Sequence, residues 1–557
     1  MMREEKMIIY QVLPRLFGNN NENRLENGTL AENGCGKFAD FTPTCLRAIK
    51  KLGATHIWYT GVLEHATATA YENIVADNST IIKGIAGSPY AVRDYYDVDA
   101  DLSEDVSRRI NEFEALVSRT HRSGLGVIID FVPNHVARVY RSDMKPDGVQ
   151  DFGEGDRSDW HFSPQNNFYY FPNTPFAPQF EVADYNEIPA KATGNDCFSA
   201  SPSVNDWYET VKLNYGVDYM GAHARHFDPL PDTWLKMRDI LLYWAEKGVD
   251  GFRCDMAEMV PVEFWHWVIA ELKTRFPNLF FVAEVYNPSL YRSYIHYGGF
   301  DYLYDKVGLY DTLRGVMCGY ISASEITRAW QSVSDIQGNM LSFLENHDEQ
   351  RIASQFFANN PYKAIPAMMV AALLSASPTM CYFAQELGEQ GMDKEGFSGV
   401  DGRTTIFDYW SIDKIIRWRN AGKYDTHLLT DDERKLQAFY QKLFAIAKED
   451  AVAKGVMYDL QYLNLSNPNY DAAKQFAWLR RCGDETLLVV VNFSDEAKSI
   501  KLNIGQEVFD FLGMKCNHKQ LMKELFTNKN RYINFSPNSL PEFQLDANSG
   551  VVFKFKN

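Results

Sequence analysis

Four short segments of the chain carry carboxylates at or directly after an apolar run, and in three of them arginine or histidine stands nearby. They are DFVPNH (residues 130–135), GFRCDMAE (251–258), FVAEV (281–285) and FLENHDEQR (343–351). One acidic residue at the end of a strand is ordinary. If four strands of one sheet end this way, their charges converge at one mouth, and that repulsion indicates a functional site.

Two of these carboxylates suit the cleavage of a glycosidic bond, which needs one carboxyl group to attack the anomeric carbon and another to protonate the leaving oxygen. Arg253 and Asp255 point to the same side of an extended strand. We expect the guanidinium to keep Asp255 ionised and oriented. Glu284 follows an apolar run, which suits a carboxyl that must hold a proton. The alternative is a purely structural cluster of ion pairs.

These segments need a scaffold that aligns strand ends, and the apolar runs predict one. Strands are expected at residues 8–13, 55–60, 126–131, 251–255, 279–284, 302–304, 340–344 and 379–383. Amphipathic helices are expected between them, most clearly at 106–123 and 232–247, each followed by a glycine. Eight such units predict an α/β fold, a (β/α)8 TIM barrel with its active site at the C-terminal strand ends.

Two intervals depart from the barrel rhythm and divide the chain into domains. The barrel is expected at 1–136 and 220–445, interrupted after the third strand by an inserted subdomain at 137–219 that is rich in Asn, Asp, Pro and aromatics. Strand-like runs at 475–479, 486–493, 499–504 and 550–555 predict a C-terminal antiparallel β-sandwich domain at 446–557. That domain either binds glycan or caps the barrel, and we expect Trp478 in its core.

Composition excludes several classes of partner. The formal net charge of −17 over 557 residues disfavours nucleic acid and anionic membranes. None of the 8 cysteines forms a C-x-x-C pair, so zinc and redox motifs lack support. The N-terminus shows no signal-peptide core, and no apolar stretch reaches membrane-spanning length. We therefore expect a soluble, cytoplasmic chain, although removal of a signal peptide would leave the same appearance. The sequence does not indicate an oligomeric state.

The four segments resemble, in order, the four signature regions of the α-amylase family of glycoside hydrolases. The resemblance spans the chain, because barrel, insertion and C-terminal β domain also recur in that family. It implies that Asp255 is the nucleophile, Glu284 the general acid/base, and Asp348 a third carboxylate that binds sugar hydroxyls. Further substrate-binding residues implied by the resemblance are Arg253, His135, His347 and Tyr90, the last stacking under the cleaved sugar. Simple packing is the alternative for Tyr90, and a capping or core role is the alternative for His135.

The resemblance implies hydrolysis of α-1,4-glucosidic bonds in starch- or glycogen-type glucans or maltooligosaccharides, with retention through a covalent glycosyl-Asp255 intermediate. An α-glucosidase, a trehalose-forming isomerase or a transglycosylase of the same family remains an alternative. A non-catalytic binding member is disfavoured because such members usually lose a carboxylate. Endo or exo action and preferred chain length stay open.

Two departures from the family pattern concern metal and substrate length. The chemistry requires no cofactor, but many α-amylases hold calcium, and Asn134 is a candidate ligand here. Lys212 stands where the family has a metal-binding aspartate, so we hypothesise that this calcium site is absent or displaced. We also expect Asp94 and Arg403 to pair and close the non-reducing side of the pocket, with a surface ion pair of little consequence as the alternative.

Overall fold

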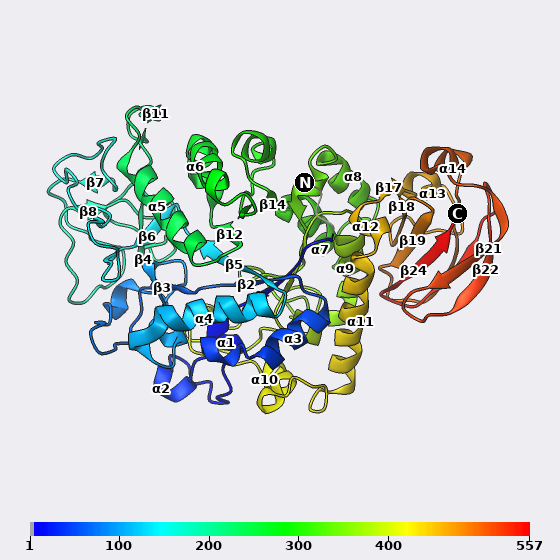
Figure 1. The fold of residues 1–557 in the computed structure, drawn as a ribbon, viewed down its shortest axis with the longest axis horizontal. Helices are drawn as coiled ribbons and strands as arrows, with labels where there is room; N and C mark the ends of the chain where they lie inside the picture. The colour runs from blue at the N-terminus through cyan, green and yellow to red at the C-terminus, as the bar shows by residue number, and fades with distance from the viewer. Residues whose placement is uncertain (1–4) are drawn as a thin grey trace.

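A computed structural model of the chain describes residues 5–557 and contains a closed barrel of parallel strands (Figure 1). The expectation about a signal peptide rests partly on residues 1–4, which lie outside the described residues. The sheet order is β15-β14-β13-β12-β5-β2-β1-β16, and a parallel bridge between Ser342 and Thr379 joins its two edges. The strands are β1 (Ile8–Val12), β2 (His56–Tyr59), β5 (Gly126–Phe131), β12 (Gly251–Cys254), β13 (Phe280–Ala283), β14 (Tyr302–Tyr304), β15 (Met340–Leu341) and β16 (Thr379–Tyr382). The predicted barrel is confirmed.

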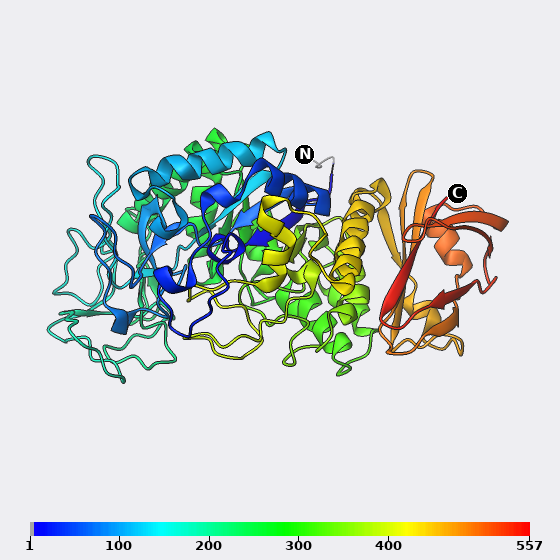
Figure 2. The same cartoon turned by 90° about the horizontal axis from the view of Figure 1, so that it is seen from below.

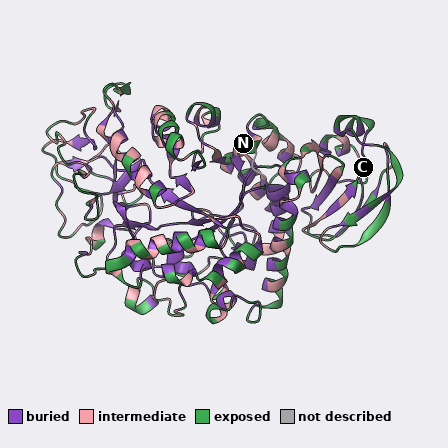
Figure 3. Ribbon diagram, viewed as in Figure 1, coloured by how far each residue is buried: buried purple, intermediate pink, exposed green. Residues whose placement is uncertain are grey.

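Helices surround the strands, and most of them combine buried and exposed residues along their length, as the colours in Figure 3 show. The region expected as one helix at 106–123 is a 3-10 turn (Val106–Arg108) followed by α4 (Arg109–Arg122), and the helix expected at 232–247 is α5 (Asp232–Glu246). The other main helices are α3 (Pro43–Leu52), α6 (Val262–Arg275), α7 (Asp311–Met317), α8 (Glu325–Ser332), α9 (Ala364–Leu373), α10 (Asp413–Arg419) and α11 (Asp431–Ala447). In α4 the buried residues include Phe113, Leu116 and Val117, whose spacing gives one apolar face.

Two additions extend the barrel at the end where its strands terminate. A hairpin of β3 (Leu63–His65) and β4 (Val92–Val98) follows the second barrel strand and was not predicted. The insertion is mostly irregular chain with short strand pairs, and it forms one end of the molecule (Figure 1). Its pairs are β6 (His135–Ala137) with β9 (Thr210–Lys212), β7 (Tyr170–Phe171) with β8 (Ala190–Lys191), and β10 (Val217–Asp218) with β11 (Ala224–Arg225).

The C-terminal domain lies at the opposite end of the molecule from the insertion, beyond α11. Both views show it as a β domain set apart from the barrel (Figures 1 and 2). A six-stranded sheet runs β17-β18-β19-β24-β21-β22, and β20 pairs with β23 in a second sheet. Bounds are β17 (Val456–Asp459), β18 (Gln475–Cys482), β19 (Glu485–Asn492), β20 (Lys498–Lys501), β21 (Asn517–Glu524), β22 (Asn530–Phe535), β23 (Glu542–Leu545) and β24 (Ser549–Lys556), with helix α14 at Gln506–Leu512. Ile500 and Phe543 of the second sheet share one core with Phe553 of the first, as a sandwich requires.

Within residues 5–557, no helix combines the length and apolar character that crossing a membrane requires.

Candidate active site

The ends of the barrel strands bring the predicted carboxylates to one cavity of about 290 Å³. Asp255, Glu284 and Asp348 line it, together with Tyr90 and His135. The backbone explains the meeting of the first two residues, because β12 and β13 are neighbouring parallel strands and the Glu284 N–H donates to the Cys254 carbonyl at 3.1 Å. The structure therefore brings these predicted strand ends together at one cavity.

Arg253 is the buried centre of the site and binds both proposed reacting carboxylates. Its Nη1 lies 2.9 Å from Asp255 Oδ1, and its Nη2 lies 2.7 Å from Glu284 Oε2. Asp130 Oδ1 is 3.5 Å away, and Nε donates to the Tyr304 hydroxyl at 3.1 Å. One guanidinium thus fixes the relative positions of carboxylates from two strands.

The electrostatics of Asp255 differ from the sequence expectation. Burial raises the pKa of Asp255 well above its usual value, Arg253 opposes that shift, and the charges of Glu284 and Asp348 add to it. Arg253 therefore orients Asp255 and favours its ionised form, but does not by itself offset the burial of Asp255 and the nearby charges of Glu284 and Asp348.

The pKa of Asp348 shifts in the opposite direction, downward. Burial would raise its pKa, but His347, Arg253 and Arg403 lower the pKa of Asp348 to about 2. His347 Nε2 lies 3.1 Å from Asp348 Oδ2, and Gln11 holds the other ring nitrogen at 2.9 Å. The third carboxylate is consequently ionised at neutral pH.

Tyr90 and His135 lie beside the carboxylates. The Tyr90 ring stacks on His347 with centroids 5.0 Å apart, and its hydroxyl lies 2.5 Å from His347 Nε2. His135 contacts Trp207, with ring centroids 5.2 Å apart. Burial, together with the charge of Lys212, lowers the pKa of His135 to about 3, so its ring is neutral and can donate one hydrogen bond and accept another.

Sequence reasoning missed Tyr286 and Trp207, which also line the cavity. The Tyr286 hydroxyl donates to Glu284 Oε1 at 2.5 Å, while the Met256 N–H donates to Glu284 Oε2 at 2.9 Å. Tyr286 stands two residues after Glu284, in the segment that directly follows β13, so its closeness to Glu284 could have been inferred from the sequence. Trp207 lies in the irregular insertion, where no period places side chains.

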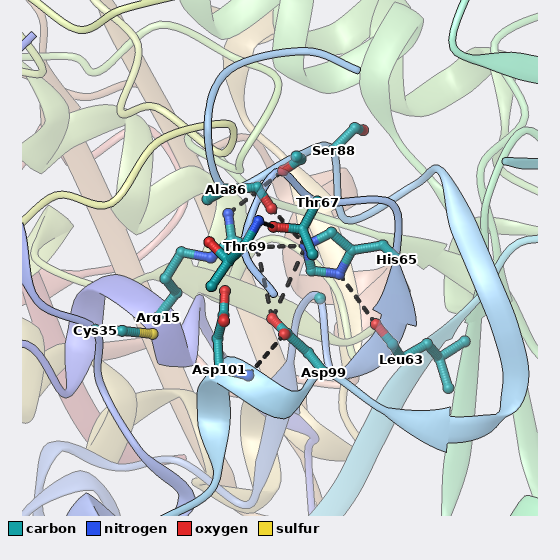
Figure 4. Close-up of polar contacts among 12 residues, drawn as sticks. Arg15, Cys35, Leu63, His65, Thr67, Thr69, Ala86, Ser88, Asp99 and Asp101 are labelled. Carbon is teal, nitrogen blue, oxygen red and sulfur yellow. Dashed lines mark hydrogen bonds and ion pairs between the residues drawn. The ribbon is translucent and has the colours of Figure 1, made fainter. Parts of the chain in front are cut away.

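A buried polar network supports the wall of the cavity (Figure 4). Arg15 Nη1 donates to the carbonyls of Ile406 at 3.1 Å and Gly87 at 3.4 Å, and so joins two loops from distant parts of the chain. Its Nη2 lies 2.5 Å from His65 Nε2, and Nη2 also lies 3.6 Å from Asp99 Oδ2. Ile406 lines the cavity, and Ser88, next to Gly87, does so too. The network therefore holds the loop that carries Tyr90.

The predicted pair between Asp94 and Arg403 is not formed. Arg403 Nη1 lies 3.3 Å from Asp401 Oδ2, and the Arg403 backbone N–H binds Asp401 as well. Asp94 is fully buried and accepts backbone N–H groups from Tyr96 at 2.7 Å and Asp143 at 3.0 Å. Asp94 lies on β4, and its carboxylate is occupied by backbone N–H groups rather than by Arg403. Arg403 instead pairs with Asp401, two residues before it.

The surroundings of Asn134 do not fit a calcium ion. The ammonium group of Lys212 donates to Asn134 Oδ1, lies 2.6 Å from Asp196 Oδ1 and donates to the Met259 carbonyl at 3.2 Å. A cation of the chain itself therefore sits among the oxygen atoms that a metal would need, and a lysine cannot ligate a hard cation at neutral pH.

A different group of carboxylates could hold a metal ion. Oxygens of Glu64, Asp94, Asp97 and Asp143 lie within 4.8 Å of one another. Two arginines partly neutralise this cluster, since Arg109 binds Asp97 and Arg93 Nη1 lies 3.5 Å from Glu64 Oε1. Acidic residues with such partners also occur without a metal, so the cluster does not by itself define a cofactor.

Comparison with known proteins places this site in a family. Residues 11–455 match the model of the α-amylase catalytic domain. Alpha-amylase 3 of Dictyoglomus thermophilum is 24% identical over 66% of this chain and 68% of that protein, and a cyclomaltodextrinase of a Bacillus species is 21% identical over 87% of this chain and 72% of that protein. The solved structure of a noncanonic maltogenic alpha-amylase, AmyB from Thermotoga neapolitana, superposes with a TM-score of 0.63 at 19% identity, covering 100% of both chains.

The chain belongs to the α-amylase family of glycoside hydrolases, since the family model covers most of its length. It is a glycosidase by that membership, with the barrel, insertion and C-terminal β domain described above.

Proposed function

We propose that the protein hydrolyses α-1,4-glucosidic bonds of starch- or glycogen-derived chains, or of maltooligosaccharides, with retention of configuration. The observation that carries this proposal is the double ion pair of Arg253 with Asp255 and Glu284 in a cavity that Asp348 also lines. An attacking carboxylate and a proton donor held by one guanidinium supply the two groups that retaining cleavage needs.

In the proposed first step, Asp255 attacks the anomeric carbon while Glu284 donates its proton to the leaving glycosidic oxygen. The C–O bond to the leaving sugar breaks as the bond to Asp255 forms. Glu284, now a carboxylate, then removes a proton from water, and the resulting nucleophile displaces Asp255. Asp348 accepts hydrogen bonds from hydroxyls of the cleaved sugar, and Tyr90 packs against its face.

No metal enters this proposal. We propose that Lys212 supplies the positive charge linking the insertion to the barrel at Asn134, because its ammonium contacts atoms of both parts. The proposed substrate is neutral, so the net charge of −17 neither attracts nor repels it.

Product analysis on maltose, maltotriose and maltoheptaose tests the proposal. The wild-type protein is expected to shorten at least one of these glucans, and Asp255→Asn to lose roughly 10³-fold or more of kcat while still binding sugar. Asp159→Asn, an exposed aspartate of the insertion, is the control and should keep full activity. An active Asp255→Asn protein would contradict the proposal. Transfer products in place of water-derived ones would indicate a transglycosylase of the same mechanism.

A further inference from the structure

A buried ion pair on the cavity wall has no role in the steps above. Lys83 Nζ lies 3.0 Å from Glu209 Oε1, and the two side chains are only 13% and 5% exposed. Both residues line the cavity that holds Asp255. The second carboxylate oxygen, Glu209 Oε2, is buried and has no hydrogen-bond partner. An unpaired oxygen of this kind costs free energy unless a ligand hydroxyl satisfies it.

Aromatic rings flank the pair. Lys83 Nζ lies 5.5 Å from the ring centroid of Tyr208 and 5.8 Å from that of Phe397. Phe397 packs on Phe407, with centroids 4.8 Å apart, and Phe407 lines the cavity. Charged hydrogen-bonding groups next to flat apolar rings match a pyranose unit, which presents hydroxyls at its edge and C–H groups on its faces.

The pair lies on the His135 side of the cavity. The positive charge of Lys83 contributes, after burial and Lys212, to lowering the pKa of His135. Glu284, the proposed proton donor, and Tyr286, which binds it, follow β13, whereas the connection that carries Lys83 follows β2. In the closed barrel β12 and β5 separate these two strands on one side, and β1, β16, β15 and β14 separate them on the other. Lys83 and Glu209 are therefore placed away from the leaving sugar, on the side of the glycosyl unit that is transferred to Asp255.

We propose that Lys83 and Glu209 bind the sugar unit next to the cleaved one on the non-reducing side, with Glu209 accepting a hydroxyl hydrogen bond and Lys83 donating one. This assignment rests on the proposed function and names the residues that recognise the substrate beyond the cleaved unit. It also ties recognition to two additions to the barrel, because Lys83 lies in the connection between β3 and β4 and Glu209 lies in the insertion just before β9.

Two chromogenic substrates distinguish binding of this neighbouring sugar unit from binding of the cleaved unit. p-Nitrophenyl α-glucoside fills only the position of the cleaved sugar, whereas p-nitrophenyl α-maltoside, when nitrophenol is released, places a second glucosyl unit against Lys83 and Glu209. For Glu209→Gln and Lys83→Met we expect kcat/KM on the maltoside to fall about tenfold or more, the loss typical of a hydrogen bond to a charged group. On the glucoside it should change less than about twofold.

Glu187→Gln is the matched control, because Glu187 is also a buried, ion-paired carboxylate of the insertion, 2.8 Å from Arg138 and 3.6 Å from Lys191, and does not line the cavity. Any loss in this control should be equal on both substrates. Equal losses on both substrates in Glu209→Gln and Lys83→Met, or no loss on the maltoside, would overturn the assignment. Failure of the wild-type protein to cleave either glycoside or any maltooligosaccharide would overturn the proposed function itself, and the assignment with it.

Discussion

At the scale of residues, the site depends on how one cation is shared among several acids. Arg253 contacts Asp255 and Glu284 from a fully enclosed position, so neither carboxylate can move without disturbing the other. The pKa values of Asp255 and Asp348 shift in opposite directions. The pKa of Asp255 is raised chiefly by burial, whereas His347, Arg253 and Arg403 overcome burial and lower the pKa of Asp348. Of these two carboxylates, the proposed nucleophile is thus the one whose pKa is raised.

This inequality predicts the acidic limb of the pH–rate profile. The proposed attack requires ionised Asp255, so kcat/KM should rise as pH increases through the raised pKa of Asp255. The midpoint of that limb should lie above about 4, the value of an ordinary aspartate. A profile of kcat/KM against pH on a maltooligosaccharide measures it. A midpoint at or below the ordinary value would show that burial does not control the nucleophile.

Tyr286 provides a second test at this scale. Its hydroxyl donates to Glu284 Oε1, and we expect this bond to position the proton donor. Tyr286→Phe keeps the ring and removes only the hydroxyl, so kcat/KM should fall roughly tenfold with the melting temperature unchanged. Kinetics beside a thermal melt would show this. Unchanged kcat/KM would mean that Arg253 and the Met256 N–H position Glu284 without Tyr286.

At the scale of elements, Lys212 connects the insertion to the barrel. It lies on β9, which pairs with β6, and its ammonium group reaches Asn134, Asp196 and the Met259 carbonyl. These three oxygen atoms come from separate segments. The lysine therefore stabilises the position of His135, which follows Asn134 directly.

Replacing this lysine should expose its structural role. Lys212→Met leaves oxygen atoms without their cation, and we expect the free energy of unfolding to fall by on the order of 2 kcal/mol in urea denaturation. Lys212→Asp should make the melting temperature rise on addition of calcium by more than in the wild-type protein, because all contacts then offer oxygen ligands. A calcium response no larger than that of the wild type would contradict this account of the site.

The elements also show what the sequence could and could not predict. Asp255 and Glu284 were predictable because the residue that follows a buried barrel strand lies at the barrel mouth, and β12 and β13 end within one residue of the expected positions. Asp94 was misplaced, since its direction depends on pairing in the β3–β4 hairpin, which carries no periodic signal. Trp207 and Glu209 lie in irregular chain, where long-range packing alone decides the direction of a side chain.

At the scale of the whole molecule, the C-terminal domain is packed onto the barrel rather than tethered to it. Trp478 is completely buried, and its indole donates to the Leu373 carbonyl at the end of α9. Arg480, also buried, donates to the Leu374 carbonyl at 3.1 Å and to carbonyls at 451 and 452. The Leu373 and Leu374 carbonyls lie together at the C-terminal end of α9, a helix of the barrel, which favours a supporting role for this face of the domain.

Trp478→Ala should therefore destabilise the protein without affecting glucan binding. We expect the free energy of unfolding to fall by about 3–5 kcal/mol, as for other buried tryptophans. Phe511→Ala, at a side chain that is 62% exposed, is the control and should be nearly neutral. Urea denaturation measures stability, and electrophoresis through gels containing amylose measures binding. Weaker retention by amylose with unchanged stability would instead assign Trp478 to a glycan site.

The central claim is that Asp255 becomes covalently bound to the sugar, and mass spectrometry of a trapped intermediate tests it most directly. In Glu284→Gln, an α-maltosyl fluoride can still react because fluoride leaves without a proton donor, while the base that activates water is missing. After digestion, we predict a maltosyl adduct on the peptide that contains Asp255. An adduct on another residue, or release of the inverted sugar with no adduct, would contradict the account.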